Sequence, residues 1–310
     1  NCSCISKRRF DMLPVPYIKS PLNYTGGKHK ILEHILPYFP SPTKRFVDLF
    51  AGGLNVGINA DAEVIYANDQ ITYLIELYEF FRATPVDILL ARIHSRIEEL
   101  GLSDSNAEAY LQLRKIYNTE KDILDLFLLT CYSFNHQIRF NGKHEFNTPF
   151  GRNRSAYNAS IEQNLIRFCH ALQKKNFVFS NVDFLSFDFS VLDAGDLVYC
   201  DPPYLITTGS YNDGKRGFKD WTVTEEQQLL DLLDSLNERH IYFALSNVFC
   251  HKGATNDLLI KWSEKYHVTF IDKTYSNCSY HFKDRNTKTA EVLVTNFERR
   301  DPACRQLTFL

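Results

Sequence analysis

The sequence predicts an α/β fold, in which an open, Rossmann-like sheet is interrupted by an inserted, mainly helical domain that carries a β-hairpin. Short apolar runs, typical of strands buried in a parallel sheet, occur at residues 46–50, 64–68, 177–180 and 197–200. Apolar spacing typical of helices occurs between the second and third of these runs, at residues 71–83, 86–100, 106–117 and 121–131. We therefore expect one sheet whose strands come from both sides of a helical insertion.

The two ends of the chain are expected to lie outside this fold. Residues 1–19 are predicted to form an N-terminal extension without fixed structure, and residues 299–310 a loose tail. Met12 is the only methionine of the chain, and the segment that it opens looks like a natural start. We therefore expect residues 1–11 to be dispensable for activity and solubility.

A glycine loop that ends in a lysine precedes the first strand. Gly26-Gly27-Lys28 lies ahead of a helix expected near residues 29–38. Its glycines lack the spacing of a phosphate-binding loop, and no Ser or Thr follows the lysine, so the pattern excludes a nucleoside triphosphatase. The loop can still offer the Lys28 cation to a carboxylate, with the Tyr24 ring beside it.

A glycine turn follows the first strand, since Gly52 and Gly53 come directly after residues 46–51. Glycine lets a backbone approach a ligand where a Cβ would clash. The second strand ends at Asp69, about 20 residues beyond Asp48, where dinucleotide folds hold ribose hydroxyls. Asp69 is equally suited to cap a helix that starts near residue 71, so both roles stay open.

A basic hairpin is expected within residues 132–156. Asn141-Gly142 predicts a tight turn between strands at residues 137–140 and 145–148. This segment contains Arg and Lys at four positions and Glu145 as its one acid. Cations suit phosphates, while amides and guanidinium groups suit base edges, so the hairpin fits a DNA groove. A solvated hairpin without a ligand is the alternative.

The segment Asp201-Pro202-Pro203-Tyr204 is the most informative loop of the chain. It follows the apolar strand at residues 197–200, and its prolines stop that strand because they have no N–H to donate. The loop presents a carboxylate, carbonyls and one aromatic ring at the carboxyl end of a strand, where open α/β sheets bind ligands. This set suits a flat group with an amine, such as a nucleobase. A proline turn after a core strand is the alternative. Residues 206–220, which follow, are expected to form a flap.

The last third of the chain is expected to complete the sheet. A capping box at Thr224–Gln227 predicts a helix that ends near Asn237, and its leucine stripe is core packing. Further strands are expected at residues 241–246, 268–272 and 290–296.

Composition limits the class of protein. The net charge of −2 over 310 residues argues against a protein that is basic throughout. No uncharged apolar run reaches the roughly 18 residues of a membrane-spanning helix, and no signal peptide is evident, so a cytoplasmic location is expected. The 8 cysteines show no zinc spacing, so no metal site is predicted.

Four of these segments appear together in one known family. Residues 21–28, 46–53, 67–69 and 201–204 resemble, in this order, the motifs of the Dam-type (D12 class) DNA adenine N6-methyltransferases, most closely the phage-encoded members. The resemblance implies transfer of a methyl group from S-adenosyl-L-methionine to an adenine flipped out of double-stranded DNA. It also implies a catalytic domain at residues 20–74 and 171–298, a target-recognition domain at residues 75–170, and possible pairing with a cognate restriction endonuclease.

The resemblance also assigns residues to roles. The target adenine is expected at Asp201, Pro202, Pro203 and Tyr204. The cofactor is expected at Tyr24, Lys28, Asp48, Phe50, Gly52, Gly53, Asp69, Asp183, Phe184 and Asp201. DNA recognition is expected from Gln137, Arg139, Asn141, Lys143, Pro149, Arg152 and Arg154.

The target sequence and the reaction class have alternatives. Enzymes of this kind that read GATC carry an arginine after a Phe-Gly pair, and here both Arg152 and Arg154 follow Gly151. Gln137 also stands where an apolar residue is common. GATC is the expected site, with the guanine-reading arginine left open. Alternative functions are methylation of another planar amine (cytosine N4, RNA adenine or protein glutamine) and a catalytically inactive DNA-binding relative. A dinucleotide oxidoreductase is disfavoured, because Gly52-Gly53 lacks the spaced-glycine fingerprint.

Overall fold

The computed structural model describes residues 17–24, 26–207, 221–271 and 289–298. Most of the expected N-terminal extension and flap, together with the whole expected tail, therefore lies outside the described residues. Within the described ranges, no helix is both long and apolar enough to cross a membrane.

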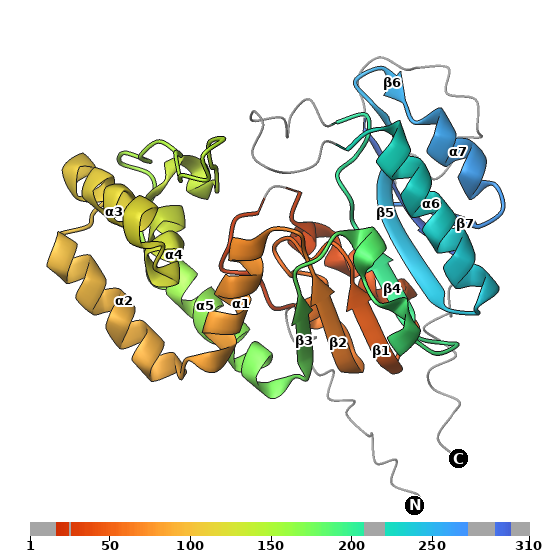
Figure 1. Ribbon diagram of the computed structural model, residues 1–310, viewed down its shortest axis with the longest axis horizontal. Coiled ribbons are helices and arrows are strands. Elements are labelled where there is room, and N and C mark those ends of the chain that lie inside the picture. Colours follow the sequence, from red (N-terminus) through yellow and green to blue (C-terminus); the bar gives the residue numbers. More distant parts are fainter. Residues whose placement is uncertain (1–16, 25, 208–220, 272–288, 299–310) are drawn as a thin grey trace, which may run out of the picture.

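The core of the molecule is an eight-stranded sheet in the order β3-β2-β1-β4-β5-β8-β7, with β6 paired to β5 (Figure 1). The neighbouring pairs among β1 to β5 are parallel, whereas β8 runs antiparallel to both β5 and β7. The strands are β1 Thr43–Asp48, β2 Ala62–Asn68, β3 Phe177–Ser180, β4 Leu197–Cys200, β5 Tyr242–His251, β6 Ala254–Thr255, β7 His267–Phe270 and β8 Ala290–Thr295. A mixed α/β fold with a mostly parallel sheet is thereby confirmed.

Helices cover both faces of this sheet, and the side chains of β4 show how the faces divide. Leu197 and Tyr199 pack into one buried cluster and Val198 and Cys200 into the other, as the two-residue period of a strand requires. Helices α1 (Thr72–Ala83) and α5 (Ala159–Lys174) belong to the first cluster, and α6 (Val223–Glu238) and α7 (Asp257–Ser263) to the second.

The helical insertion consists of α2 (Val86–Leu100), α3 (Ala107–Glu120) and α4 (Ile123–Tyr132), which lie beside α1 and α5 (Figure 1). Asp122 caps α4 by accepting hydrogen bonds from the N–H groups of Leu124 and Asp125. All of α4 after Ile123 is buried. One apolar cluster runs from the sheet through α1 to these three helices, so they join the core of the sheet by way of α1.

Some elements differ from those expected. The helix predicted near residues 29–38 is present as two short 3₁₀ helices, Lys28–His34 and Leu36–Tyr38, and Pro37 lies inside the second. The capping box of α6 begins two residues earlier than expected, with Thr222 as N-cap and Glu225 as its partner. Helix α7 and strand β6 were not expected, because seven and two residues are too few for a periodic pattern.

Candidate active site

Three carboxyl groups gather at one edge of the sheet because their strands are parallel neighbours. Asp48, the last residue of β1, pairs with Ala67 of β2 and with Tyr199 of β4. Asp69 and Asp201 each lie two residues beyond these partners. Loops from β1, β2 and β4 therefore meet at the carboxyl edge, as predicted for a ligand site in an open α/β sheet.

The glycine turn after β1 is held by side chains from two other segments. The Gly52 N–H donates to Asp69 Oδ2 over 2.8 Å, and the Tyr78 hydroxyl donates to the Gly52 carbonyl. Gly52 has a φ of +46°, and a Cβ there would lie 2.9 Å from Tyr24 Cε1. The Tyr24 ring thus rests on the turn, so the structure brings together three residues expected at the cofactor: Tyr24, Gly52 and Asp69.

Asp48 and Asp69 are buried carboxyl groups with raised pKa values. Burial raises the pKa of Asp48 to about 7, and the nearby Asp201 and Asp69 add to this, although a hydrogen bond from the Gly57 N–H opposes it. Burial likewise raises the pKa of Asp69 to about 6, against hydrogen bonds from the N–H groups of Ile71 and Gly52. This corner of the sheet therefore favours a positively charged ligand. Asp69 also has the local role that the sequence left open, since Oδ1 accepts from the Ile71 N–H at the start of α1.

The proline loop and the lysine loop meet at one carboxylate oxygen. Lys28 Nζ lies 2.9 Å from Asp201 Oδ1, and the Tyr204 hydroxyl donates to the same oxygen over 3.0 Å. Lys28 Nζ also lies 5.1 Å from the centroid of the Tyr204 ring. The Lys28 side chain is 7% exposed and that of Asp201 19%. Residues far apart in sequence thus meet at one partly exposed corner of the sheet edge.

Glu291 is a further carboxylate at this corner, and sequence reasoning missed it. It lies on β8, opposite Val248 near the carboxyl end of β5. Its Oε1 lies 3.7 Å from Lys28 Nζ. Burial raises the pKa of Glu291, while Lys28 partly opposes that shift. The sequence held no signal for this residue, because only the antiparallel pairing of β8 brings it to the edge.

Three aromatic rings pack together next to the glycine turn. The Phe50 and Phe184 centroids lie 5.5 Å apart, and Trp221 lies 5.7 Å from Phe50 and 5.5 Å from Phe184. Asp183 caps the short helix that begins at Phe184 by accepting the Leu185 N–H. Phe50, Asp183 and Phe184 were expected at the cofactor, whereas Trp221 was missed.

A buried hydrogen-bond network holds Trp221. Its Nε1 donates to Glu226 Oε2 over 2.7 Å, while Asn247 and Asn256 donate to Glu226 Oε1 over 3.1 and 2.8 Å. Burial raises the pKa of Glu226, and these three donors oppose the shift. The network links α6 to β5 and to the start of α7, so it fixes the aromatic cluster to the second face of the sheet.

Asn68 ties the loops after β1 and β3 together. Its Nδ2 donates to the carbonyls of Leu49 and Val182 over 3.2 and 3.0 Å. Its Oδ1 accepts from the Ser180 hydroxyl and from the Val182 N–H over 2.8 and 3.2 Å. Asn68 is the last residue of β2, and its side chain therefore braces the edge of the sheet where the candidate site lies.

Comparisons with known proteins agree with this geometry. The family model described as D12 class N6 adenine-specific DNA methyltransferase matches residues 24–289. The chain belongs to this family. It is 53% identical over 281 residues to the Type II methyltransferase M.FokI of Planomicrobium okeanokoites, covering 91% of this chain and 43% of that protein. It is 49% identical over 286 residues to the modification methylase StsI of Streptococcus sanguinis, covering 92% of this chain and 44% of that one.

A more distant relative matches over most of its own length. The DNA adenine methylase of Escherichia coli K12 is 28% identical over 232 residues, which cover 73% of this chain and 79% of the relative. In contrast, the chain spans less than half the length of M.FokI and StsI.

The segment of this D12-class chain that was expected to read DNA is a chain reversal with isolated bridges. Phe140 pairs with Phe146 and Ser133 with Phe150 in antiparallel bridges, rather than in two regular strands. The tight turn expected at Asn141-Gly142 is present, because the His144 N–H donates to the Asn141 carbonyl over 3.0 Å. The Asn141 N–H also donates to the Glu145 carbonyl, and His144 is left-handed. The Asn141 side chain reinforces the turn, because its Oδ1 accepts the N–H groups of Lys143 and Glu145.

This reversal is docked on the helical insertion. Asn118 of α3 both donates to the Phe146 carbonyl and accepts the Phe146 N–H, over 3.1 and 2.7 Å. Arg139 turns inward and donates to Asn147 Oδ1 and to the Asn147 carbonyl. Asn141 is half-buried. The other residues expected to read DNA are exposed, and they are Gln137, Lys143, Pro149, Arg152 and Arg154.

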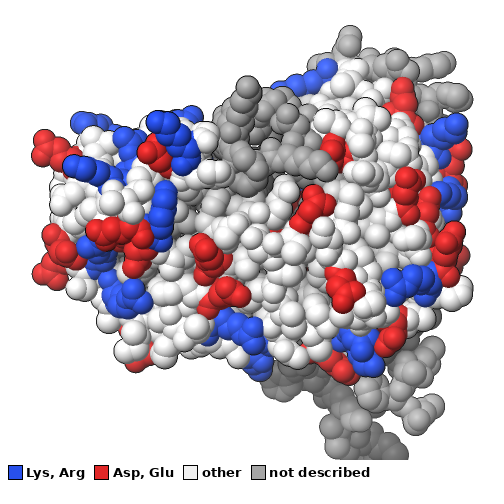
Figure 2. Space-filling view, viewed as in Figure 1, with Lys and Arg blue, Asp and Glu red and all other residues white. Residues whose placement is uncertain are grey.

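Charge is distributed unevenly over the molecule. Figure 2 shows Lys and Arg side chains, with some acids among them, near the top of the helical part, where Figure 1 draws α3 and the chain that follows α4. Arg154 belongs to the chain that follows α4, and its Cζ lies 5.2 Å from the ring centroid of the exposed Phe134. A cation beside an exposed ring suits contact with nucleic acid.

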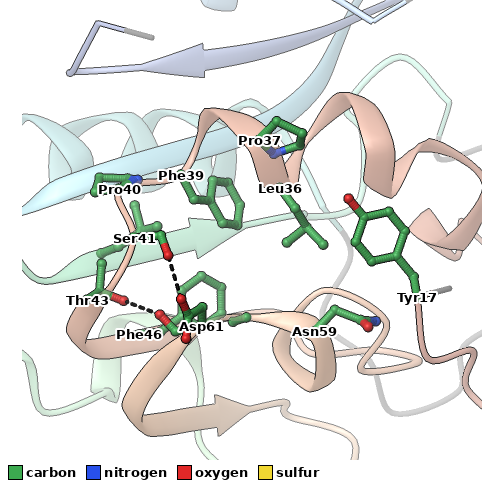
Figure 3. A pocket seen from close by; sticks show the side chains of 12 residues that line it. Tyr17, Leu36, Pro37, Phe39, Pro40, Ser41, Thr43, Phe46, Asn59 and Asp61 are labelled. Atoms are coloured by element: carbon green, nitrogen blue, oxygen red, sulfur yellow. Dashed lines mark hydrogen bonds between the residues drawn. The ribbon is translucent and has the colours of Figure 1, made fainter. Parts of the chain in front are cut away.

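A cavity of about 240 Å³ lies elsewhere, at the opposite edge of the sheet (Figure 3). It is lined by Leu197 and Thr43, the first residues of β4 and β1, and by Asp61, which precedes β2. The Ser41 and Thr43 hydroxyls donate to Asp61 there. Since the acids of the candidate site follow the carboxyl ends of these strands, this cavity is no part of that site.

Proposed function

We propose that the chain transfers a methyl group from S-adenosyl-L-methionine to the N6 amine of adenine in double-stranded DNA. The observation that carries the proposal is the corner at the end of β4, where Asp201 stands beside Pro202 and contacts Lys28 and Tyr204. A carboxylate and a proline carbonyl in sequence offer two acceptors for the two hydrogens of an amine.

The residues around this corner fit the proposed donor. Gly52 has no Cβ on the side where the Tyr24 ring lies. A ligand that displaces this ring can therefore approach the backbone of the glycine turn closely. Asp48, Asp69 and Asp201 create a negative potential that suits a sulfonium. The cluster of Phe50, Phe184 and Trp221 offers apolar faces to an adenine ring, with Asp183 beside it as an acceptor.

The proposed chemistry depends mainly on positioning. The lone pair of an aromatic amine is delocalised into the ring, so the amine is a weak nucleophile. Asp201 and the Pro202 carbonyl each accept one N–H and thereby turn the lone pair out of the ring plane. S-adenosyl-L-methionine, when bound, would supply a methyl group on a sulfonium sulfur that leaves as a neutral thioether. As the N–C bond forms and the S–C bond breaks, the amine nitrogen loses one proton, which Asp201 can accept. Tyr204 stacks on the base, and the rate gain comes from orientation and matched charge.

Base flipping and sequence reading are assigned to the helical insertion. An amine that is paired in a duplex must leave the stack to reach Asp201. We assign phosphate contacts to Lys143, Arg152 and Arg154, and base-edge contacts to Gln137, because these side chains are exposed on a docked reversal. Asn141 is assigned to shape the reversal, because its side chain bonds the N–H groups of Lys143 and Glu145 and the Glu145 carboxylate. Arg139 donates from Nε and Nη2 to Asn147, so we assign it to fix the conformation of the reversal that contacts DNA. Pro149 is assigned to shape the same reversal.

GATC is the first target sequence to test, and pairing with a restriction endonuclease is a further expectation. The printed names of the relatives, a Type II methyltransferase and a modification methylase, support such a partner. Identity to M.FokI is nearly twice that to the Escherichia coli enzyme (53% against 28%), so the test must also include sequences other than GATC.

The experiment is methylation of a duplex library with random central positions, followed by mapping of the modified base at single-nucleotide resolution. The proposal predicts N6-methyladenine in one sequence context, dependent on S-adenosyl-L-methionine and absent with Asp201→Ala. Modification at another tetranucleotide would replace GATC and leave the chemistry intact. Methylcytosine, methylated RNA alone, or binding of DNA without transfer would each support one of the alternative functions instead.

A further inference from the structure

Glu226 is a carboxylate in the core, and it is held by neutral donors. It lies in the first turn of α6 and is 1% exposed. Its Oε2 accepts from Trp221 Nε1 over 2.7 Å, and its Oε1 accepts from Asn247 and Asn256 Nδ2 over 3.1 and 2.8 Å. An apolar side chain of the same volume would be less unfavourable to bury, so the hydrogen-bond geometry of Glu226 needs a reason beyond core packing.

The two asparagines are fixed in orientation by hydrogen bonds of their own. Asn247 Oδ1 accepts the N–H of the next residue on β5 over 2.8 Å, and Asn256 Oδ1 accepts an N–H in the first turn of α7 over 3.1 Å. Their Nδ2 groups therefore face Glu226 as donors and share Oε1. The other oxygen, Oε2, is the acceptor that remains for the indole N–H of Trp221.

The backbone of Trp221 is fixed as well as its side chain. Trp221 stands directly before Thr222, the N-cap of α6, which forms a capping box with Glu225. The capping box sets where the backbone enters the helix, while Glu226 in the next positions of the same turn sets the direction of the indole N–H. The ring of Trp221 is therefore held from two sides, and it is 9% exposed.

The indole ring held in this way forms part of the aromatic cluster beside the glycine turn. Its centroid lies 5.7 Å from that of Phe50, with the two rings at 81°, and 5.5 Å from that of Phe184. Phe50 lies two residues beyond Asp48, at the acidic corner that suits a sulfonium, and Phe184 follows Asp183 in the loop after β3. The cluster thus offers flat apolar rings next to that corner, as a purine requires.

We propose that Glu226 is a positioning residue for the cofactor, because it holds the Trp221 ring as one wall of the site that receives the adenine of S-adenosyl-L-methionine. The inference rests on the proposed function, since it deepens the account of how that cofactor is bound. Glu226 acts only through the indole N–H, whereas Trp221 is the residue that contacts the adenine.

Glu226→Gln removes the acceptor of the indole and keeps the shape of the side chain. Glutamine has one oxygen and one NH2 group in place of the two carboxylate oxygens. The oxygen should stay with Asn247 and Asn256, because turning either asparagine would break the bond that its Oδ1 makes to the backbone. The NH2 group then faces the N–H of Trp221, and two donors cannot bond to each other.

Asp234→Asn is the matched control. Asp234 also lies on α6, and its Oδ1 accepts from Trp262 Nε1 over 2.9 Å. Trp262 packs against Phe243 and Tyr266, on the side of α6 where Figure 1 draws α7. Each variant therefore removes one charge from α6 and disturbs one bond between a tryptophan and a carboxylate. Because the chain has 2 tryptophans, Trp262→Phe leaves Trp221 as the sole tryptophan, and Trp221→Phe leaves Trp262.

S-adenosylhomocysteine is the probe, and its affinity is measured by calorimetry at a temperature at which every variant is folded. Both Glu226→Gln and Asp234→Asn should lower the melting temperature, but only Glu226→Gln should weaken binding of the probe, by about tenfold, as expected for the loss of one hydrogen bond to a charged group. In a Trp221→Phe background, Glu226→Gln should weaken binding little further, because the N–H that it positions is gone.

Tryptophan fluorescence gives a reading of contact that does not depend on activity. With Trp221 as the sole tryptophan, saturating S-adenosylhomocysteine should quench the emission, and Glu226→Gln should reduce that quenching. With Trp262 as the sole tryptophan, the probe should leave the emission unchanged.

The outcomes separate this inference from the proposed function. Unchanged affinity in Glu226→Gln, an equal loss in Asp234→Asn, or an additive loss in the Trp221→Phe background would overturn the role of Glu226. Binding of the probe without quenching of Trp221 would place the adenine elsewhere and would also overturn it. In each of these cases the proposed function stands. A wild-type chain that binds neither S-adenosyl-L-methionine nor S-adenosylhomocysteine would refute the proposed function, and the role of Glu226 with it.

Discussion

The buried acid at the end of β1 should make the protein less stable as pH rises. Asp48 is 1% exposed, and its pKa is raised from 3.8 to about 7, mainly by burial. Because the pKa in the folded state exceeds that of the unfolded chain, the folded state binds the proton more tightly between these values. The stability that this proton provides is fully present below about pH 4 and is lost as pH rises through about 7.

Asp48→Asn tests this reasoning quantitatively. Asparagine keeps an oxygen that can accept the Gly57 N–H, which donates to Asp48 Oδ2 over 2.9 Å, and it cannot ionise. With a pKa of about 7, ionisation of Asp48 costs roughly 2 kcal/mol between about pH 5.5 and about pH 8.5. The free energy of unfolding of the variant should therefore gain roughly 2 kcal/mol on that of the wild type over this interval.

Urea denaturation of both proteins at the two pH values measures the difference. A cofactor titration adds a second reading, because an ionised Asp48 attracts a cation. Asp48→Asn should weaken S-adenosyl-L-methionine about tenfold and affect S-adenosylhomocysteine, which lacks the sulfonium charge, much less. The reasoning is refuted if the two stability curves run parallel in pH, or if both ligands lose affinity equally.

Three further predictions follow from the site. Asp201→Ala should abolish methyl transfer while the protein still folds, although loss of the carboxylate beside the buried Lys28 ammonium should lower its melting temperature. Tyr204→Phe, which loses one hydrogen bond to Asp201, should cost about fivefold in rate, and Tyr204→Ala far more. Gly52→Ala should lower the free energy of unfolding in urea more than Gly195→Ala does. Both glycines have a positive φ, +46° and +89°, but a Cβ at Gly52 would lie 2.9 Å from Tyr24 Cε1, whereas a Cβ at Gly195 would meet open space. Equal losses would show that the contact with Tyr24 does not constrain the turn. Arg152→Ala and Arg154→Ala should each reduce by about one the magnitude of the slope of log affinity for DNA against log salt concentration, as measured by fluorescence anisotropy. An unchanged slope would show that the arginine concerned does not contact a phosphate.

Sequence reasoning located the elements whose signals are local. The apolar run of β4, for example, is short and continuous, and the structure has this strand at Leu197–Cys200 as expected. The acids Asp48, Asp69 and Asp201 were found because each ends a strand, and parallel neighbours bring their carboxyl ends to one edge. Such residues can be predicted since strand, turn and side chain are adjacent in the chain.

Residues that reach the site through long-range pairing could not be predicted in this way. Glu291 is one polar residue in an apolar strand, and only the antiparallel register of β8 against β5 brings it to Lys28. Trp221 lies near Phe50 because its Nε1 donates to Glu226, which is held in turn by hydrogen bonds from Asn247 and Asn256. The turn at Asn141 was predicted from its local Asn-Gly signal, whereas the two flanking strands are replaced by isolated bridges, because Asn118 of α3 takes both backbone groups of Phe146.

The central claim is that Asp201 and the Pro202 carbonyl together receive the amine of a flipped adenine. The most direct measurement is a crystal structure of the protein with S-adenosylhomocysteine and a duplex that contains its mapped target. The account predicts the adenine outside the stack, with N6 about 3 Å from an Asp201 carboxylate oxygen and about 3 Å from the Pro202 carbonyl oxygen. An adenine still stacked in the helix, or an extrahelical base whose amine contacts neither oxygen, would contradict it.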